Sequence, residues 1–117
     1  MPINKTTLPK DQNGESFYAA NKATFHKAVA VTYNTRYALE LDATTHKNVK
    51  GILVHNNTGG IVYYGGADVN TPAADPTKQG VPIANGSSDT FTATVGFTLN
   101  IMPAATGYIV ITYFCGN

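Results

Sequence analysis

The chain has 117 residues, of which 13% are charged, and its formal net charge at pH 7 is +1. This length is typical of one domain, large enough to bury a core without disulfides or a metal. The charge lacks the clustered Lys and Arg of a nucleic-acid-binding domain, and a single cysteine, Cys115, excludes an intrachain disulfide and a cysteine-based zinc site.

Residues 1–22 are polar and carry no strand or helix periodicity. We expect an extended N-terminal arm, because such a segment buries too little apolar surface to order itself. Phe17 and Tyr18 would anchor the arm on a neighbouring subunit; a frayed terminus or a strap on its own domain are the alternatives. No signal peptide or membrane span is predicted, since no apolar run has the required length. We therefore expect synthesis in the cytoplasm.

Alternating apolar and polar residues predict the first strands. Residues 24–33 place Phe25, Val29, Val31 and Tyr33 on one face. A helix over 17–31 competes with this interpretation, but the β-branched residues favour a strand in its second half. Residues 37–42 form a half-buried strand with its acids outward, and residues 43–48 form a loop.

The middle of the chain predicts a hairpin and a long loop. Strands at 49–56 and 60–64 are expected to pair around a tight turn at 57–59, because Asn and Gly tolerate the positive φ of such turns. Gly65 and Gly66 end the second strand, and residues 67–80 form an exposed loop with two prolines. Residues 81–83 form a short edge strand, because Pro82 donates no hydrogen bond, and Asn85-Gly86 forms a turn.

The last third predicts strands at 90–95, 97–101 and 108–114, with a turn over 102–107. The final strand is almost continuously apolar, which predicts burial on both faces or at an interface. Short strands at this spacing indicate an all-β fold with little helix. We expect an antiparallel β-sandwich, jelly-roll-like or Ig-like, over residues 23–117; a barrel is the alternative.

The sequence predicts no enzyme and no cofactor. The three histidines lie at His26, His46 and His55, without metal-ligand spacing, and Cys115 has no neighbouring base that would make it a nucleophile. Calcium on Asp68, Asn70 and Asp75 is an alternative, since carboxylate and amide oxygens suit it, but the ligand register of an EF-hand is missing.

Tyrosine supports a different alternative. The chain has seven tyrosines and no tryptophan. The adjacent Tyr63 and Tyr64 should point to opposite faces of a strand, one toward the core. A row of exposed tyrosines could stack on sugar rings, so a receptor- or carbohydrate-binding module is the second functional hypothesis.

Residues 50–114 resemble small structural proteins of tailed bacteriophage virions. The resemblance is carried by Gly65, Gly66, Asp68 and Val69, by the return over residues 80–83, and by the Gly86-Ser87 turn before the final strands. It implies a β-sandwich building block of the virion, as in proteins that decorate or cement capsids; a tail or head–tail component is an alternative. The implied partners are the major capsid protein or other virion proteins.

The two segments that we expect to contact partners are the arm and the loop 66–80. A homo-oligomer is expected, and a trimer would match the symmetry axes of a shell. The candidate partner-binding residues are Phe17, Tyr18, Asp68, Asn70, Thr71, Pro72, Asp75, Pro76 and Lys78.

Overall fold

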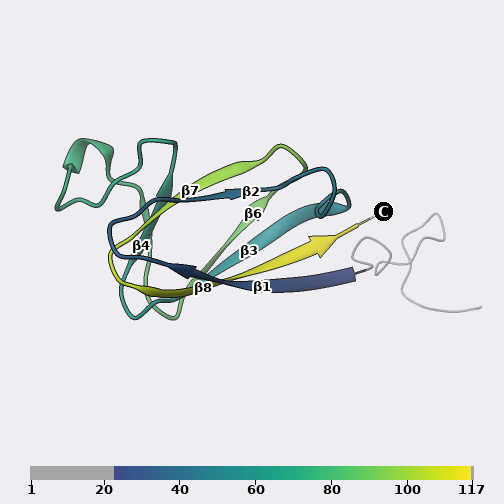
Figure 1. Ribbon diagram of the computed structural model, residues 1–117, viewed down its shortest axis with the longest axis horizontal. Coiled ribbons are helices and arrows are strands. Elements are labelled where there is room, and N and C mark those ends of the chain that lie inside the picture. Colours follow the sequence, from purple (N-terminus) through teal and green to yellow (C-terminus); the bar gives the residue numbers. More distant parts are fainter. Residues whose placement is uncertain (1–22, 117) are drawn as a thin grey trace, which may run out of the picture.

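The computed structural model describes residues 23–116, which form two four-stranded antiparallel sheets (Figure 1). The predicted arm, with Phe17 and Tyr18, lies outside the described residues. The strands are β1 (Ala23–Val31), β2 (Tyr37–Glu40), β3 (Val49–Asn57), β4 (Val62–Gly65), β5 (Val81–Ile83), β6 (Ser88–Thr92), β7 (Thr98–Pro103) and β8 (Gly107–Cys115).

The strand order identifies the type of sandwich. One sheet has the order β1-β8-β3-β6 and the other β2-β7-β4-β5. Every connection crosses between the sheets except the one from β4 to β5, which joins neighbours. An eight-stranded double sheet with this winding is a jelly roll. The prediction of an antiparallel β-sandwich is confirmed, and the order favours the jelly-roll form over the Ig-like form.

The predicted hairpin between residues 49–56 and 60–64 is wrong. β3 and β4 belong to different sheets, so residues 58–61 form a corner between the sheets. Gly59 has the expected positive φ of 95°, but it serves that corner. The side chain of Asn56 determines the corner, because it donates to the carbonyl oxygens of Gly60 and Ile83 at 2.6 and 2.7 Å.

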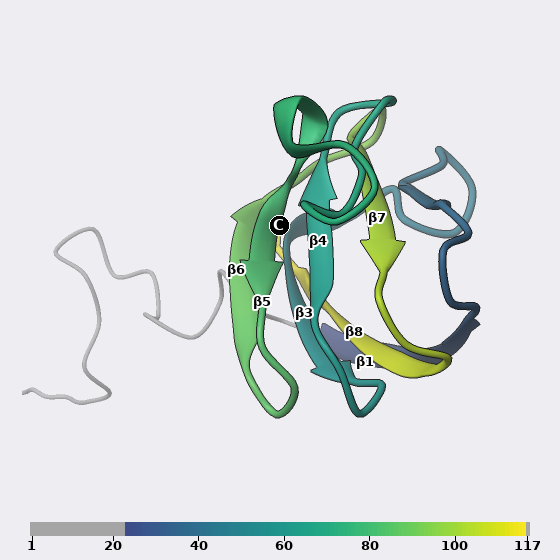
Figure 2. The ribbon, with the colours of Figure 1, turned by 90° about the vertical axis from the view of Figure 1, so that its left-hand side faces the viewer.

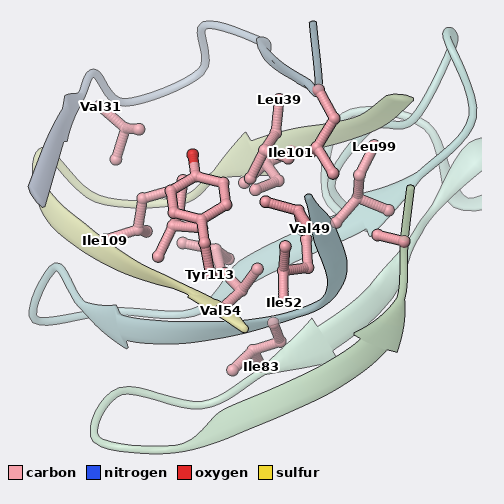
Figure 3. Packing of buried hydrophobic residues seen from close by; sticks show 14 of the residues in the cluster. Val31, Leu39, Val49, Ile52, Val54, Ile83, Leu99, Ile101, Ile109 and Tyr113 are labelled. Carbon is pink, nitrogen blue, oxygen red and sulfur yellow. The ribbon is translucent and has the colours of Figure 1, made fainter. Parts of the chain in front are cut away.

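The core lies between the sheets and follows the predicted alternation. The central strands β3 and β8 contribute Ile52, Val54, Ile109 and Ile111, all fully buried (Figure 3). The opposite sheet faces them with a second set of apolar side chains, which are Leu39, Val62, Ile83, Leu99 and Ile101. Burial of these alternating side chains holds the two sheets together.

Two strands are shorter than predicted, and their last apolar residues are exposed. β1 ends at Val31, so Tyr33 lies in a turn and is 62% exposed. β6 ends at Thr92, so Val95 also lies in a turn, 43% exposed. The chain must turn at these points to change sheets. The alternation of apolar and polar residues does not show where such a turn begins.

The last two strands also differ from the prediction. β7 continues through Met102 and Pro103, both buried, so the turn that follows is shorter than expected. β8 buries only its inner face, while Tyr108 on its outer face is 54% exposed. The prediction that β8 is buried on both faces is therefore wrong within the domain.

Helix content is low, as predicted. Between residues 23 and 116 the helical structure is one 3-10 turn, Pro76–Lys78, and no helix there is long and apolar enough to cross a membrane. The short strand β5 lies at a sheet edge, which confirms the position predicted from Pro82.

Candidate partner-binding loop

The connection from β4 to β5, residues 66–80, is far longer than the fold requires; we call it the end loop. The two strands pair directly, with Val62 opposite Ile83 and Tyr64 opposite Val81. Antiparallel neighbours are commonly joined by two to five residues. Figure 2 shows the end loop above the paired β4 and β5, and in Figure 1 it projects at the left, remote from the end of β8.

The end loop is anchored by Val69. This residue is 2% exposed and packs against Gly65 and Gly80, where the absence of side chains leaves room for it. Its carbonyl oxygen accepts a hydrogen bond from Nε of Arg36, at 2.7 Å. The loop is therefore fixed to the sheet by one buried apolar side chain and one charge-assisted hydrogen bond.

Backbone hydrogen bonds close the base of the loop. Asn70 N donates to Lys78 O at 2.9 Å, and Gly80 N donates to Asn70 O at 3.2 Å. Asn70 and Gln79 form a short parallel bridge. Beyond it, Thr71 O accepts from the backbone N of Asp75 at 3.0 Å, which makes a turn over Pro72. These bonds order the loop without a partner.

Asp75 caps the 3-10 turn. Its carboxylate accepts from Thr77 N at 3.1 Å and from Thr77 Oγ1 at 2.7 Å. Pro76 occupies the first position of the turn, where a missing N–H costs nothing. Lys78 Nζ lies 3.2 Å from Asp68 Oδ2, with both side chains largely exposed. Such a pair contributes at most about 1 kcal/mol.

The end loop therefore brings together seven of the nine predicted partner-binding residues. Asp68, Asn70, Thr71, Pro72, Asp75, Pro76 and Lys78 all lie on it, and the other two lie outside the described residues. Sequence reasoning missed the anchor, Val69 with Arg36. An apolar residue between Asp68 and Asn70 was a usable signal for Val69, whereas nothing local indicates Arg36, which lies 33 residues away.

Each of the three side chains considered for calcium has one oxygen in a contact within the end loop. Asp68 pairs with Lys78, Asp75 caps Thr77, and Asn70 Oδ1 accepts from Thr71 N at 2.9 Å. Over residues 23–116 no three His, Cys, Asp or Glu side chains gather as a metal site would need. The calcium alternative thus finds no ligand cluster in this region.

The other candidate reactive residues lie on different elements, although Cys115 and His46 are near each other: Cys115 pairs with Val49, and Val49 N donates to His46 O. Cys115 is buried at the end of β8. His46 lies in the loop before β3, where its ring stacks on Tyr113 and its Nδ1 accepts from Asp42 N at 2.9 Å. His55 lies on the outer face of β3, and its Nδ1 is hydrogen-bonded to Ser88 Oγ at 2.7 Å.

The tyrosines are distributed over several elements. Tyr64 points inward, packs edge-on against Phe91, and has a pKa raised by burial and by Asp89. Tyr63 lies on the other face of β4, which confirms the predicted split of this pair. Among residues 23–116 the two most exposed tyrosines are Tyr33, in a turn, and Tyr108, on the outer face of β8.

We predict that Gly80→Ala destabilises the protein by about 2 kcal/mol, because the added Cβ would overlap Val69 Cγ2 and Tyr64 O. Gly66→Ala is the matched control. A Cβ there has only Asp68 Oδ1 nearby, at 3.9 Å, so its effect should stay within about 0.5 kcal/mol. Urea unfolding measures both. Equal stability of the two variants would show that Val69 does not need the space at Gly80.

We also predict an acid-sensitive end loop. The hydroxyl and backbone N–H of Thr77, with the charge of Lys78, hold the pKa of Asp75 below its usual 3.8. Because the folded pKa is lowered, this carboxylate stabilises the fold above about pH 4, and the contribution is lost as the pH falls through the lowered pKa. NMR titration should show the low midpoint, and Thr77→Ala should raise it. A wild-type midpoint at or above 3.8 would contradict this capping role.

No protein-family model and no curated protein sequence match the chain. Among solved structures, it is similar to a de novo designed double-stranded β-helix, at 10% identity and a TM-score of 0.47, over 77% of this chain and 96% of that chain. It is also similar to a structure reported under the description "Bacillus endospore appendages form a novel family of disulfide-linked pili", at 16% identity and a TM-score of 0.37, over 84% of this chain and 95% of that chain. At these values neither similarity bears on function.

Proposed function

We propose that the chain is a structural protein of a phage virion, which decorates the capsid by binding between major capsid subunits through the end loop. The assignment to a virion rests on the resemblance of residues 50–114 to virion structural proteins. The observation that carries a binding role is the end loop itself, an ordered extension that the β4–β5 hairpin does not require.

Connections of this length are uncommon in compact domains, and apart from one 3-10 turn and one bridge the end loop has no regular secondary structure. The hydrogen bonds at Asn70, Thr71 and Asp75 and the anchor at Val69 order the end loop. A surface that is ordered before binding loses little conformational entropy on binding. The exposed residues Ala73, Ala74, Pro76 and Thr77 are small or rigid and carry no charge, so covering them also costs little desolvation.

Decoration would stabilise the particle by mass action. A protein that binds the assembled lattice and not the free subunits shifts the equilibrium toward the lattice. At a free concentration of 100 times the Kd, the stabilisation is about 2.7 kcal/mol for each site. Many sites on one shell multiply this effect.

Co-sedimentation tests the proposal, with phage particles made from a genome that lacks the gene. Wild-type protein should pellet with these particles and raise the temperature at which they release DNA. Lys78→Glu, which leaves the end loop acidic beside Asp68 and Asp75, should weaken binding at least about tenfold. Lys47→Glu, the same charge reversal at an exposed residue in another loop, should bind like wild type. Failure to pellet, or equal binding by both variants, would contradict the proposal.

A further inference from the structure

The outer face of the sheet β1-β8-β3-β6 is free of fixed charge. It is formed by every second residue of the four strands, starting from Thr24, Gly51, Ser88 and Tyr108, because these positions pair across the sheet on the side opposite the core. None of these positions holds Asp, Glu, Lys or Arg, and two of them hold histidines, His26 and His55. The bulge residue Lys50 borders one corner. We call this surface the outer face.

The outer face mixes apolar and neutral polar side chains on its central strands and has a polar rim on one side. The central strands β3 and β8 present the half-buried side chains of Leu53, Val110 and Phe114, together with His55, Asn57 and Thr112. The edge strand β6 presents the exposed hydroxyls of Ser88, Thr90 and Thr92. Leu53, Val110 and Phe114 supply apolar area of the kind that protein–protein interfaces bury at their centre, and the hydroxyls of β6 resemble a polar rim.

We propose that the outer face is the interface of a two-fold homodimer, in which the outer faces of two copies pack together. In such a dimer the same patch meets itself, so any fixed charge near its centre would meet a like charge. A face without fixed charge avoids that repulsion. It also offers nothing to a nucleic acid or to a charged protein surface, which need opposite charges to bind. A second copy presents the same face without fixed charge, so it is a partner that fits this chemistry.

The sheet edges are less suited to pairing than the face. Lys27, opposite the buried Ile111, points to the inner side of edge strand β1, and inward-pointing charges of this kind block the addition of another strand. The other edge, β6, spans only five residues. The outer face can instead pack against a second sheet, at the usual distance of about 10 Å between packed sheets.

Area sets the expected strength of the dimer. With a strand spacing of about 4.8 Å and a rise of about 3.3 Å per residue, the outer face covers about 500 Å² in projection. A standard interface buries about 800 Å² on each partner. We therefore expect a reversible dimer with a Kd in the micromolar range. A trimer, expected from the resemblance, would need two different patches that meet each other. This inference is independent of the end loop, which lies on the other sheet.

Light scattering and sedimentation equilibrium of the full chain test the proposal. Wild-type protein should shift from monomer to dimer as its concentration rises. Val110→Glu, at the centre of the outer face, should weaken the dimer about a hundredfold, since two carboxylates would meet near the two-fold axis. The control Val95→Glu, an exposed valine in the turn after β6, should dimerise like wild type. Circular dichroism checks that both variants are folded.

A disulfide provides a second readout that does not depend on weakening the dimer. Thr112→Cys lies at the middle of the outer face, so oxidation should link two copies rapidly, whereas Val95→Cys should remain mostly unlinked. The native Cys115 is buried, so oxidised wild-type protein should stay unlinked and gives the background of the experiment. A wild-type monomer at all concentrations, a trimer, or a dimer that Val110→Glu leaves intact would each overturn the proposal.

Discussion

Asn56→Ala should lower the free energy of unfolding by about 4 kcal/mol, because each buried polar group left without a partner costs about 1–3 kcal/mol. Asn56 is fully buried. Its amide donates to Gly60 O and Ile83 O, and its carbonyl accepts from Thr58 N at 2.9 Å and Thr58 Oγ1 at 2.8 Å. The alanine variant removes all four bonds.

The effect should be large because Asn56 joins the two sheets. It lies on β3, while Ile83 belongs to β5 of the other sheet. Its backbone N also donates to Ser87 O at 2.9 Å, which holds the turn between β5 and β6.

Denaturant unfolding of Asn56→Ala beside Asn57→Ala tests this prediction. Asn57 is exposed on the outer face, so its variant should differ from wild type by no more than about 0.5 kcal/mol at a concentration where the protein is monomeric. Similar losses for the two variants would mean that the corner does not depend on the buried amide.

Ile109→Ala should cost about 3 kcal/mol, within the usual range for a fully buried isoleucine, while Val110→Ala should cost about 1 kcal/mol or less. These neighbours lie on the same central strand. Ile109 is 0% exposed between the sheets, and Val110 is half-buried on the outer face. The pair therefore separates the contribution of the core from that of the outer face with the backbone held constant.

Urea unfolding at several protein concentrations measures both effects. The cost of Ile109→Ala should not depend on concentration, because the core belongs to each subunit. The cost of Val110→Ala should grow at concentrations where dimers form, since truncation then also removes interface contacts. Equal costs in the monomer would contradict the assignment of Val110 to an open face.

The alternation of apolar and polar residues determined most of the secondary structure and its faces. In β8, Ile109, Ile111 and Tyr113 alternate with Tyr108, Val110 and Thr112, and the first set is buried. This pattern is readable because successive side chains of a strand point to opposite sides. Pro82 likewise indicated an edge strand by its missing N–H. The seven loop residues were grouped by their place between Gly65 and Val81.

Only the tertiary structure decided which strands pair. β3 and β4 are adjacent in sequence with a turn-forming link, yet they lie in different sheets, because Asn56 and the packing of both sheets favour a corner there. The anchor of Arg36 on Val69 and the uncharged outer face also arise from residues far apart in the chain. Alternation within a strand determines its two faces, whereas pairing depends on long-range contacts. The sequence alone therefore determined the strands and the position of the end loop, and the fold decided which surfaces they form.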